Sequence, residues 1–147
     1  MLAKLQERRG TLTDESGFTL IELLVVLIII GVLLAIAVPS YLGFRDKAQQ
    51  TAAASDVREA EPSAEAYYSD QSPNTYAGMS APGLKTSYDA GMQVSTSGSD
   101  GVVTAVGGAT QYCISAKNGN WYAHVVGPGG TIVQKESTDF CATWTAD

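Results

Sequence analysis

The chain has 147 residues and a net charge of −6 at pH 7, and 45% of its residues are hydrophobic. This acidic balance argues against broad nucleic-acid binding, whose affinity comes from neutralising phosphates with Lys and Arg. The sequence has no phosphate-binding glycine motif, zinc-ligand spacing or Gly-x-Ser-x-Gly motif, and its single histidine has no evident catalytic partner. We therefore expect a protein that is not an enzyme and needs no cofactor or metal.

An almost unbroken apolar run covers residues 18–38, and its one charge is Glu22. At ~1.5 Å per helical residue, this run can cross a hydrocarbon core of about 30 Å. Upstream, Lys4, Arg8 and Arg9 supply the positive bias of a segment whose N-terminus stays in the cytoplasm. A carboxylate at the bilayer centre costs roughly 2 to 4 kcal/mol, so Glu22 predicts a positively charged partner.

Three interpretations of this N-terminus differ in where the chain is cut. In the first, the chain is cut before the apolar run. In the second, the run is a secretory signal peptide that is cut after the small-x-small site Ala35-Ile36-Ala37, and in the third it is a membrane anchor that is not cut. The signal peptide is disfavoured because acidic Asp14 and Glu15 lie beside the apolar region and Glu22 interrupts its start.

The first interpretation is supported by a resemblance. Residues 17–22, Gly-Phe-Thr-Leu-Ile-Glu, match the cleavage motif of type IV prepilins without substitution, and the chain resembles that family here. The resemblance implies that a prepilin peptidase removes the leader, residues 1–17, by cutting between Gly17 and Phe18, and methylates the new amino group of Phe18. This leader is longer than that of many type IVa pilins.

Cleavage would leave an ammonium group on Phe18, with which Glu22 of a neighbouring helix could pair in an apolar filament core. Such a pair would set the register between subunits, because losing one partner leaves an unpaired buried charge that commonly costs ~3 to 5 kcal/mol. The alternative is that Glu22 reaches the lipid headgroups from near the helix start.

Small and helix-breaking residues follow along the same helix. Gly31 and Ala35 form a small-xxx-small pair that allows close helix packing. Pro39, with Gly43 four residues later, predicts a hinge, because proline removes a helical hydrogen bond. The resemblance implies that the region marked by Gly31, Pro39 and Gly43 can unwind on assembly.

The pattern changes beyond the apolar run. A helix is predicted over residues 18–71, with 18–38 as membrane span or filament core and 39–71 amphipathic. Pro62 predicts a kink in its second half. The face expected to pack on a sheet consists of Ala53, Val57, Ala60, Ala64 and Tyr67.

A connector without clear periodicity covers residues 72–91, and Tyr76, Met79 and Leu84 are expected to dock it. Residues 92–147 should form an antiparallel sheet and a C-terminal loop, and the turn is predicted at Asn118-Gly119. The predicted strands are 92–96, 102–106, 110–117, 121–126 and 131–135. The expected class is α+β and type IV pilin-like, with one long helix on four to five strands.

Cys113 and Cys141 are the only cysteines, and both lie in the part predicted to be outside the cytoplasm. An even count in an exported chain favours a disulfide, which would stabilise the fold by about 3 to 4 kcal/mol. The resemblance supports this pairing, which would close a loop over residues 114–140. A metal site needs further ligands, which the lone His124, expected to be a surface or satisfied strand residue, does not supply.

The resemblance also implies a function. The chain would be a major type IV pilin, a single-pass precursor in the cytoplasmic membrane that is later assembled by a platform and ATPases. Its product would be a homopolymeric helical filament, a fimbrium on the cell surface, for cell adhesion, twitching motility or uptake. A type II secretion pseudopilin or a minor or competence pilin is the alternative within the family. A secreted or anchored binding domain that never polymerises is the alternative outside it.

Overall fold

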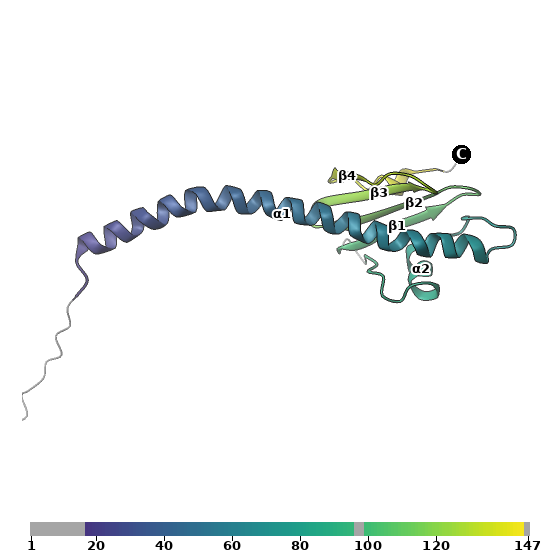
Figure 1. The fold of residues 1–147 in the computed structure, drawn as a ribbon, viewed down its shortest axis with the longest axis horizontal. Helices are drawn as coiled ribbons and strands as arrows, with labels where there is room; N and C mark the ends of the chain where they lie inside the picture. Colours follow the sequence, from purple (N-terminus) through teal and green to yellow (C-terminus); the bar gives the residue numbers. More distant parts are fainter. Residues whose placement is uncertain (1–16, 96–98, 146–147) are drawn as a thin grey trace, which may run out of the picture. The chain divides into compact units, whose positions relative to one another are not determined.

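The computed structural model describes residues 17–95 and 99–145, and all of the predicted leader except Gly17 lies outside these ranges. Figure 1 shows one long helix, one short helix and a sheet, which confirms the α+β class. The elements are α1 (Leu20–Asp70), α2 (Ala81–Ser87), β1 (Gly101–Gly107), β2 (Tyr112–Asn118), β3 (Trp121–Gly127), β4 (Val133–Glu136) and the 3₁₀ turn η1 (Cys141–Thr143). Contacts divide the chain after Ser40 into an N-terminal unit and a second unit, which we call the head.

The N-terminal unit contains the apolar part of α1. An 18-residue window of this helix reaches a mean hydropathy of 3.2, and none of that window is buried. By length and composition it can cross a membrane. Pro39 lies within α1, and it has no N–H to donate to a helical carbonyl. The next residue adds a hydrogen bond, because the Ser40 hydroxyl donates to the Ile36 carbonyl at 3.2 Å.

In the head, α1 packs on a four-stranded antiparallel sheet of order β1-β2-β3-β4. The helix face consists of small residues, which let the backbone approach the sheet closely: Ala53, Ala54, Val57, Ala60 and Ala64. The sheet contributes cross-strand pairs such as Ile114 with Val125 and Ala116 with Ala123. The predicted packing face is confirmed, although Tyr67 is only partly buried.

The predicted first strand, residues 92–96, is wrong over the residues that the structure describes, and Thr96 lies outside them. Val94 forms a single parallel bridge with Val102, and the Val102 N–H donates to the Gln93 carbonyl at 2.8 Å. A parallel pair needs a crossover of about a dozen residues or more, and the connection here is too short to extend the pairing.

The predicted connector contains a helix that the sequence analysis missed. At the start of α2, the Ser80 Oγ accepts from the Gly83 N–H at 3.3 Å, and Pro82 lies in the first turn. These are ordinary helix-start signals, and they were available in the sequence. Leu84 of α2 is fully buried, and Tyr76 and Met79 are buried, so the predicted docking is confirmed.

The turn between β2 and β3 lies one residue later than predicted. Asn118 still pairs with Trp121, so the turn residues are Gly119 and Asn120. Gly119 has φ 58°, and a Cβ there would lie 2.4 Å from the Gln49 side chain. Its positive φ therefore favours glycine, whereas the end of the Gln49 side chain could move to admit a Cβ.

Candidate functional site

The start of α1 is closed by a reciprocal set of hydrogen bonds. The Thr19 Oγ1 accepts from the Glu22 N–H at 3.3 Å, and the Glu22 Oε2 accepts from the Thr19 N–H at 2.9 Å. The Thr19 hydroxyl also donates to the same carboxylate oxygen at 2.7 Å. This is a capping box, in which two residues three apart satisfy the free donors of a helix start. The sequence analysis missed Thr19, although the Thr-x-x-Glu spacing was the signal.

The capping box fixes where the negative charge lies. It holds the Glu22 carboxylate at the N-terminal end of α1, where the helix dipole favours an anion. Phe18, the residue that cleavage would make N-terminal, precedes Thr19 directly. The single acidic group of this segment is therefore held beside the predicted new chain end.

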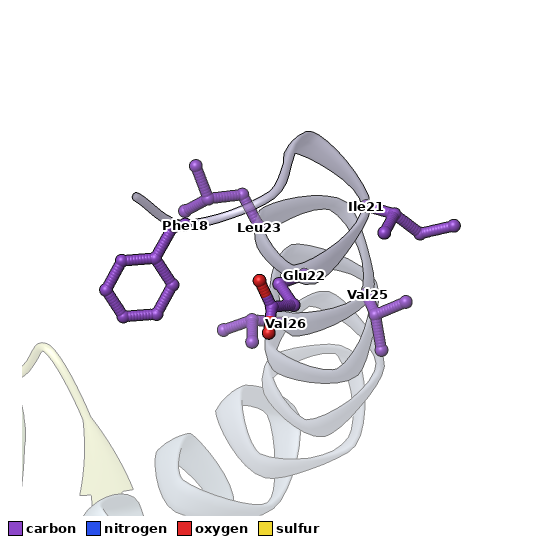
Figure 2. A pocket seen from close by; sticks show the side chains of 6 residues that line it. All are labelled: Phe18, Ile21, Glu22, Leu23, Val25 and Val26. Atoms are coloured by element: carbon purple, nitrogen blue, oxygen red, sulfur yellow. The ribbon is translucent and has the colours of Figure 1, made fainter. Parts of the chain in front are cut away.

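The surroundings of the carboxylate are apolar and open. A hollow of about 540 Å³ is lined by Phe18, Ile21, Glu22, Leu23, Val25 and Val26. Figure 2 shows the Phe18 ring and the Glu22 carboxylate on one side of the helix, with Ile21 and Val25 on the other. Phe18 is 84% exposed. A second apolar surface is needed to cover these side chains.

Two glycines of the predicted hinge region have open space beside them in the described part of the chain. A Cβ added to Gly31 or Gly43 would meet nothing within 4 Å among the described residues. Their small size therefore leaves room for an approach from outside the chain. Through Pro39, α1 is continuous here, so unwinding on assembly stays a prediction.

The predicted disulfide is confirmed. Cys113 of β2 and Cys141 of η1 are joined with an S–S distance of 2.04 Å and a Cα–Cα distance of 5.5 Å. Both cysteines are buried. The bond attaches the C-terminal segment to the sheet face opposite α1 and closes residues 114–140 into a loop.

A second attachment lies beside the disulfide, and we call it the Asp139 clasp. The Asp139 carboxylate accepts from the Thr104 hydroxyl at 2.6 Å, the Ser115 hydroxyl at 2.6 Å and the Cys141 N–H at 3.0 Å. Thr104 and Ser115 are cross-strand partners in β1 and β2. The sequence analysis did not identify Asp139, because its partners lie 24 and 35 residues away and no local pattern joins them.

His124 continues this polar row into β3, opposite Ser115. Its ring stacks on Phe140 at a centroid distance of 4.4 Å and is 9% exposed. Burial lowers the pKa of His124, Asp139 opposes that shift, and Lys135 adds to it. The expectation of a satisfied strand residue holds only in part, because the Nδ1 has no hydrogen-bond partner within the described residues. Within those residues no three His, Cys, Asp or Glu side chains form a metal site.

Comparisons with known proteins point to the N-terminus. The prokaryotic N-terminal methylation motif matches residues 12–38. The chain is similar to type II secretion system core protein G of Aeromonas hydrophila, with 38% identity over 79 residues, 52% of each chain. It is also similar to fimbrial protein EcpC of Eikenella corrodens, with 37% identity over 95 residues, 62% of this chain and 61% of the relative.

Core protein G of Escherichia coli is 48% identical over 46 residues, which cover 31% of this chain and 32% of the relative. The chain thus spans only part of the length of these curated relatives, between 32% and 61%. No solved structure matches the chain.

Proposed function

The chain belongs to the type IV pilin-like superfamily, and we propose from this that it is a filament subunit whose α1 packs among copies of itself. The observation that carries the proposal is the placement of Glu22. A capping box holds its carboxylate beside Phe18, in a helix segment whose other side chains are apolar and exposed. Such a segment needs both apolar neighbours and a cation, and other copies with a free Phe18 amine supply both.

Processing precedes assembly in this proposal. The precursor is held in the cytoplasmic membrane by the apolar half of α1, with the head outside. A prepilin peptidase cuts after Gly17 and methylates the amino group of Phe18, and an assembly platform with its ATPases then extracts the subunit. The charge of the amine survives methylation, so the pair with Glu22 remains available.

Among pilin-like filaments, we place the type II secretion pseudopilin first. Core protein G from several bacteria, including Aeromonas hydrophila and Vibrio cholerae, is similar to this chain. This reverses the order of the sequence analysis, in which the major pilin of a surface filament came first. The major pilin is the second candidate, because the match to fimbrial protein EcpC covers a larger share of this chain, 62%.

Intact mass tests the processing step. Protein from membranes and from the fraction sheared off the cell surface is weighed with and without reduction. We expect a chain that begins at a methylated Phe18 and becomes two hydrogens heavier on reduction. A chain beginning at Val38 would indicate an ordinary secreted protein, and one beginning at Met1 an unprocessed anchor.

Deletion of the gene in its own cells separates the two candidates. For a pseudopilin, folded proteins that normally reach the medium accumulate inside the cell envelope while surface filaments persist. For a major pilin, surface filaments disappear while secretion continues. Restoring the parent gene must reverse either effect, and a deletion that changes neither phenotype contradicts both candidates.

A further inference from the structure

A short stretch of α1 lies between the apolar run and the part of the helix that packs on the sheet. It covers residues 41–47, and every one of them is exposed. The first fully buried residues of α1 are Ala53 and Ala54, farther along the helix. Contacts assign residues 41–47 to the head, but the head does not cover their side chains.

This stretch combines aromatic rings with cations. Tyr41 is 67% exposed and Phe44 is 76% exposed, and Arg45 and Lys47 are exposed as well. We call these four residues the belt. Asp46 is the one acidic residue between the two cations, so the stretch keeps a net charge of +1. The belt therefore fits surroundings that are partly apolar and that carry negative charge.

The belt residues are distributed around the helix. At 3.6 residues per turn, Arg45 and Lys47 lie roughly 160° apart around the axis, with Tyr41 and Phe44 between them. One flat protein surface cannot contact both cations at once. A layer of lipid headgroups surrounds a helix that crosses it, so it can receive side chains from every side. The angular arrangement therefore favours a surrounding layer over a partner's face.

The belt begins where the apolar part of α1 is long enough to have crossed a membrane. From Leu20 to Ser40 the helix rises about 30 Å at ~1.5 Å per residue, which equals the thickness of a hydrocarbon core. Because α1 continues without a break, the residues after Ser40 then lie at the level of the headgroups. Tyrosine rings are favoured at this level, and long cationic side chains reach the phosphates from it.

The carboxylates of α1 in the head do not oppose this placement. The nearest of them beyond the belt is Asp56, nine residues after Lys47. This separation corresponds to about 14 Å along the helix, whereas charges are screened over about 8 Å in physiological salt. An anionic membrane surface can therefore attract the belt without strongly repelling the acidic part of α1.

We propose that the belt binds the anionic phospholipid headgroups of the outer leaflet of the cytoplasmic membrane, and that this contact fixes the depth of the precursor before assembly. The inference rests on the proposed function, because it takes from it the membrane location with the head outside. Phospholipid is favoured over a second copy of the chain, because the belt carries its cations on nearly opposite sides of the helix and directly follows the apolar span.

The full-length chain in vesicles tests the belt. In a Ser40→Cys background, the closed bond between Cys113 and Cys141 leaves one free thiol, at the expected edge of the hydrocarbon core. The vesicles contain phosphatidylcholine alone or an equal mixture with phosphatidylglycerol, and the reaction of this thiol with a membrane-impermeant maleimide reports its depth. Arg45→Glu with Lys47→Glu should raise the rate at least threefold in the anionic vesicles, because the headgroups then repel the belt outward. In the neutral vesicles the rate should stay within about twofold of the parent.

Two controls separate this contact from net charge and from folding. Lys85→Glu with Lys135→Glu makes the same charge change outside α1 and should leave the rate within about twofold of the parent in both kinds of vesicle. A closed disulfide, detected by mass before and after reduction, shows that a variant head has folded. If the reversed belt does not enter vesicles, Arg45→Gln with Lys47→Gln should still raise the rate about twofold in anionic vesicles at low salt, and the difference should disappear at high salt.

The aromatic half of the belt is tested in the same vesicles. Tyr41→Ser with Phe44→Ser should raise the rate at least twofold in both kinds of vesicle, because the preference of the rings for the interface does not depend on the lipid charge. A rate equal to that of the parent would exclude the two rings from the contact.

The outcomes also distinguish this inference from the proposed function. If the reversed belt reacts like the parent in anionic vesicles, or rises equally in both kinds of vesicle, the belt does not bind anionic headgroups. An unchanged depth together with a loss of cross-linked oligomers in whole cells would assign the belt to a contact between copies instead. The vesicle measurement needs no assembly. A Glu22→Ala variant that still forms cross-linked oligomers in whole cells therefore contradicts the proposed function and leaves the vesicle result as it is.

Discussion

The N-terminal unit and the head differ in where their stabilising contacts come from. In the N-terminal unit, apolar side chains are exposed, and the hydrogen bonds at its start join residues three apart. In the head, small apolar side chains are buried between helix and sheet, and the C-terminal segment is held by contacts 24 to 35 residues apart. The head therefore completes its own core, while the N-terminal unit needs surroundings that one chain does not supply.

This contrast predicts that substitutions in the two regions act on different properties. The largest effect is expected for Glu22→Ala, which removes both the capping box and the charge available to a neighbouring amine. An unpaired amine buried in the filament core costs ~3 to 5 kcal/mol, so the filament fraction should fall at least a hundredfold. The measurement is the amount of chain that chemical cross-linking of whole cells traps as oligomers, relative to the monomer in the membrane pool, which reports assembly for either candidate.

Thr19→Ala is the matched control for Glu22→Ala. It removes the cap hydroxyl, at a local cost of ~0.5 to 2 kcal/mol, but leaves the Glu22 carboxylate in place. Assembly should fall much less than in Glu22→Ala, and the disulfide in the head should still close. Equal losses in the two variants would mean that helix capping alone explains the role of Glu22.

The second prediction concerns the head. Cys113→Ser with Cys141→Ser should lower the free energy of unfolding by about 3 to 4 kcal/mol, because the unfolded chain regains the freedom of the closed loop. Denaturant unfolding of the full-length chain in detergent, followed by tryptophan fluorescence, measures the loss. Reducing the parent should give the same loss. A double variant as stable as the oxidised parent would show that the Asp139 clasp holds the segment alone.

The third prediction tests that clasp directly. Asp139→Asn keeps the shape of the side chain but replaces a charged acceptor of three hydrogen bonds, so the free energy of unfolding should fall by about 1.5 to 3 kcal/mol. The disulfide should also be reduced faster by dithiothreitol, because the loop opens more often. Asp89→Asn is the control, since Asp89 accepts from the exposed Gly91 N–H nearby in sequence. Similar effects of both variants would argue against a special role for Asp139.

Most features that depend on residues close in sequence could be predicted, whereas most features that depend on distant residues could not. The long helix and its sheet-facing alanines could be predicted from the helical spacing of apolar residues. The disulfide could be predicted because the chain has only two cysteines. Glu22 was singled out from the sequence as a charge that needs a partner, and its role in assembly stays a prediction. The role of Thr19 in holding Glu22 was missed despite a local signal. The Asp139 clasp could not be predicted, because it depends on strand register. The prediction of a strand at residues 92–96 was wrong, because the β-propensity of a segment does not show whether a neighbouring strand is available to pair with it.

The smallest expected effect is the pH dependence of head stability through His124. Burial lowers the pKa of His124 below its ordinary value of 6.5. The unfolded chain therefore binds the proton first as the pH falls. Stability should be full above about pH 6.5 and should decline below it, towards the pKa of the folded state. Urea unfolding of the full-length chain at pH 7 and pH 5 measures this change.

His124→Phe is the matched variant, because it keeps an aromatic ring against Phe140 and cannot take up a proton. It should lose less stability than the parent between pH 7 and pH 5, and the remaining loss reports the carboxylates of the head. Asp139→Asn should steepen the decline, because Asp139 is the negative charge that favours the protonated ring. If the parent and the His124→Phe variant have the same pH profile, the His124 ring is open to water in the folded head and burial does not lower its pKa. The C-terminal segment would then depend on its surroundings, as the N-terminal unit does.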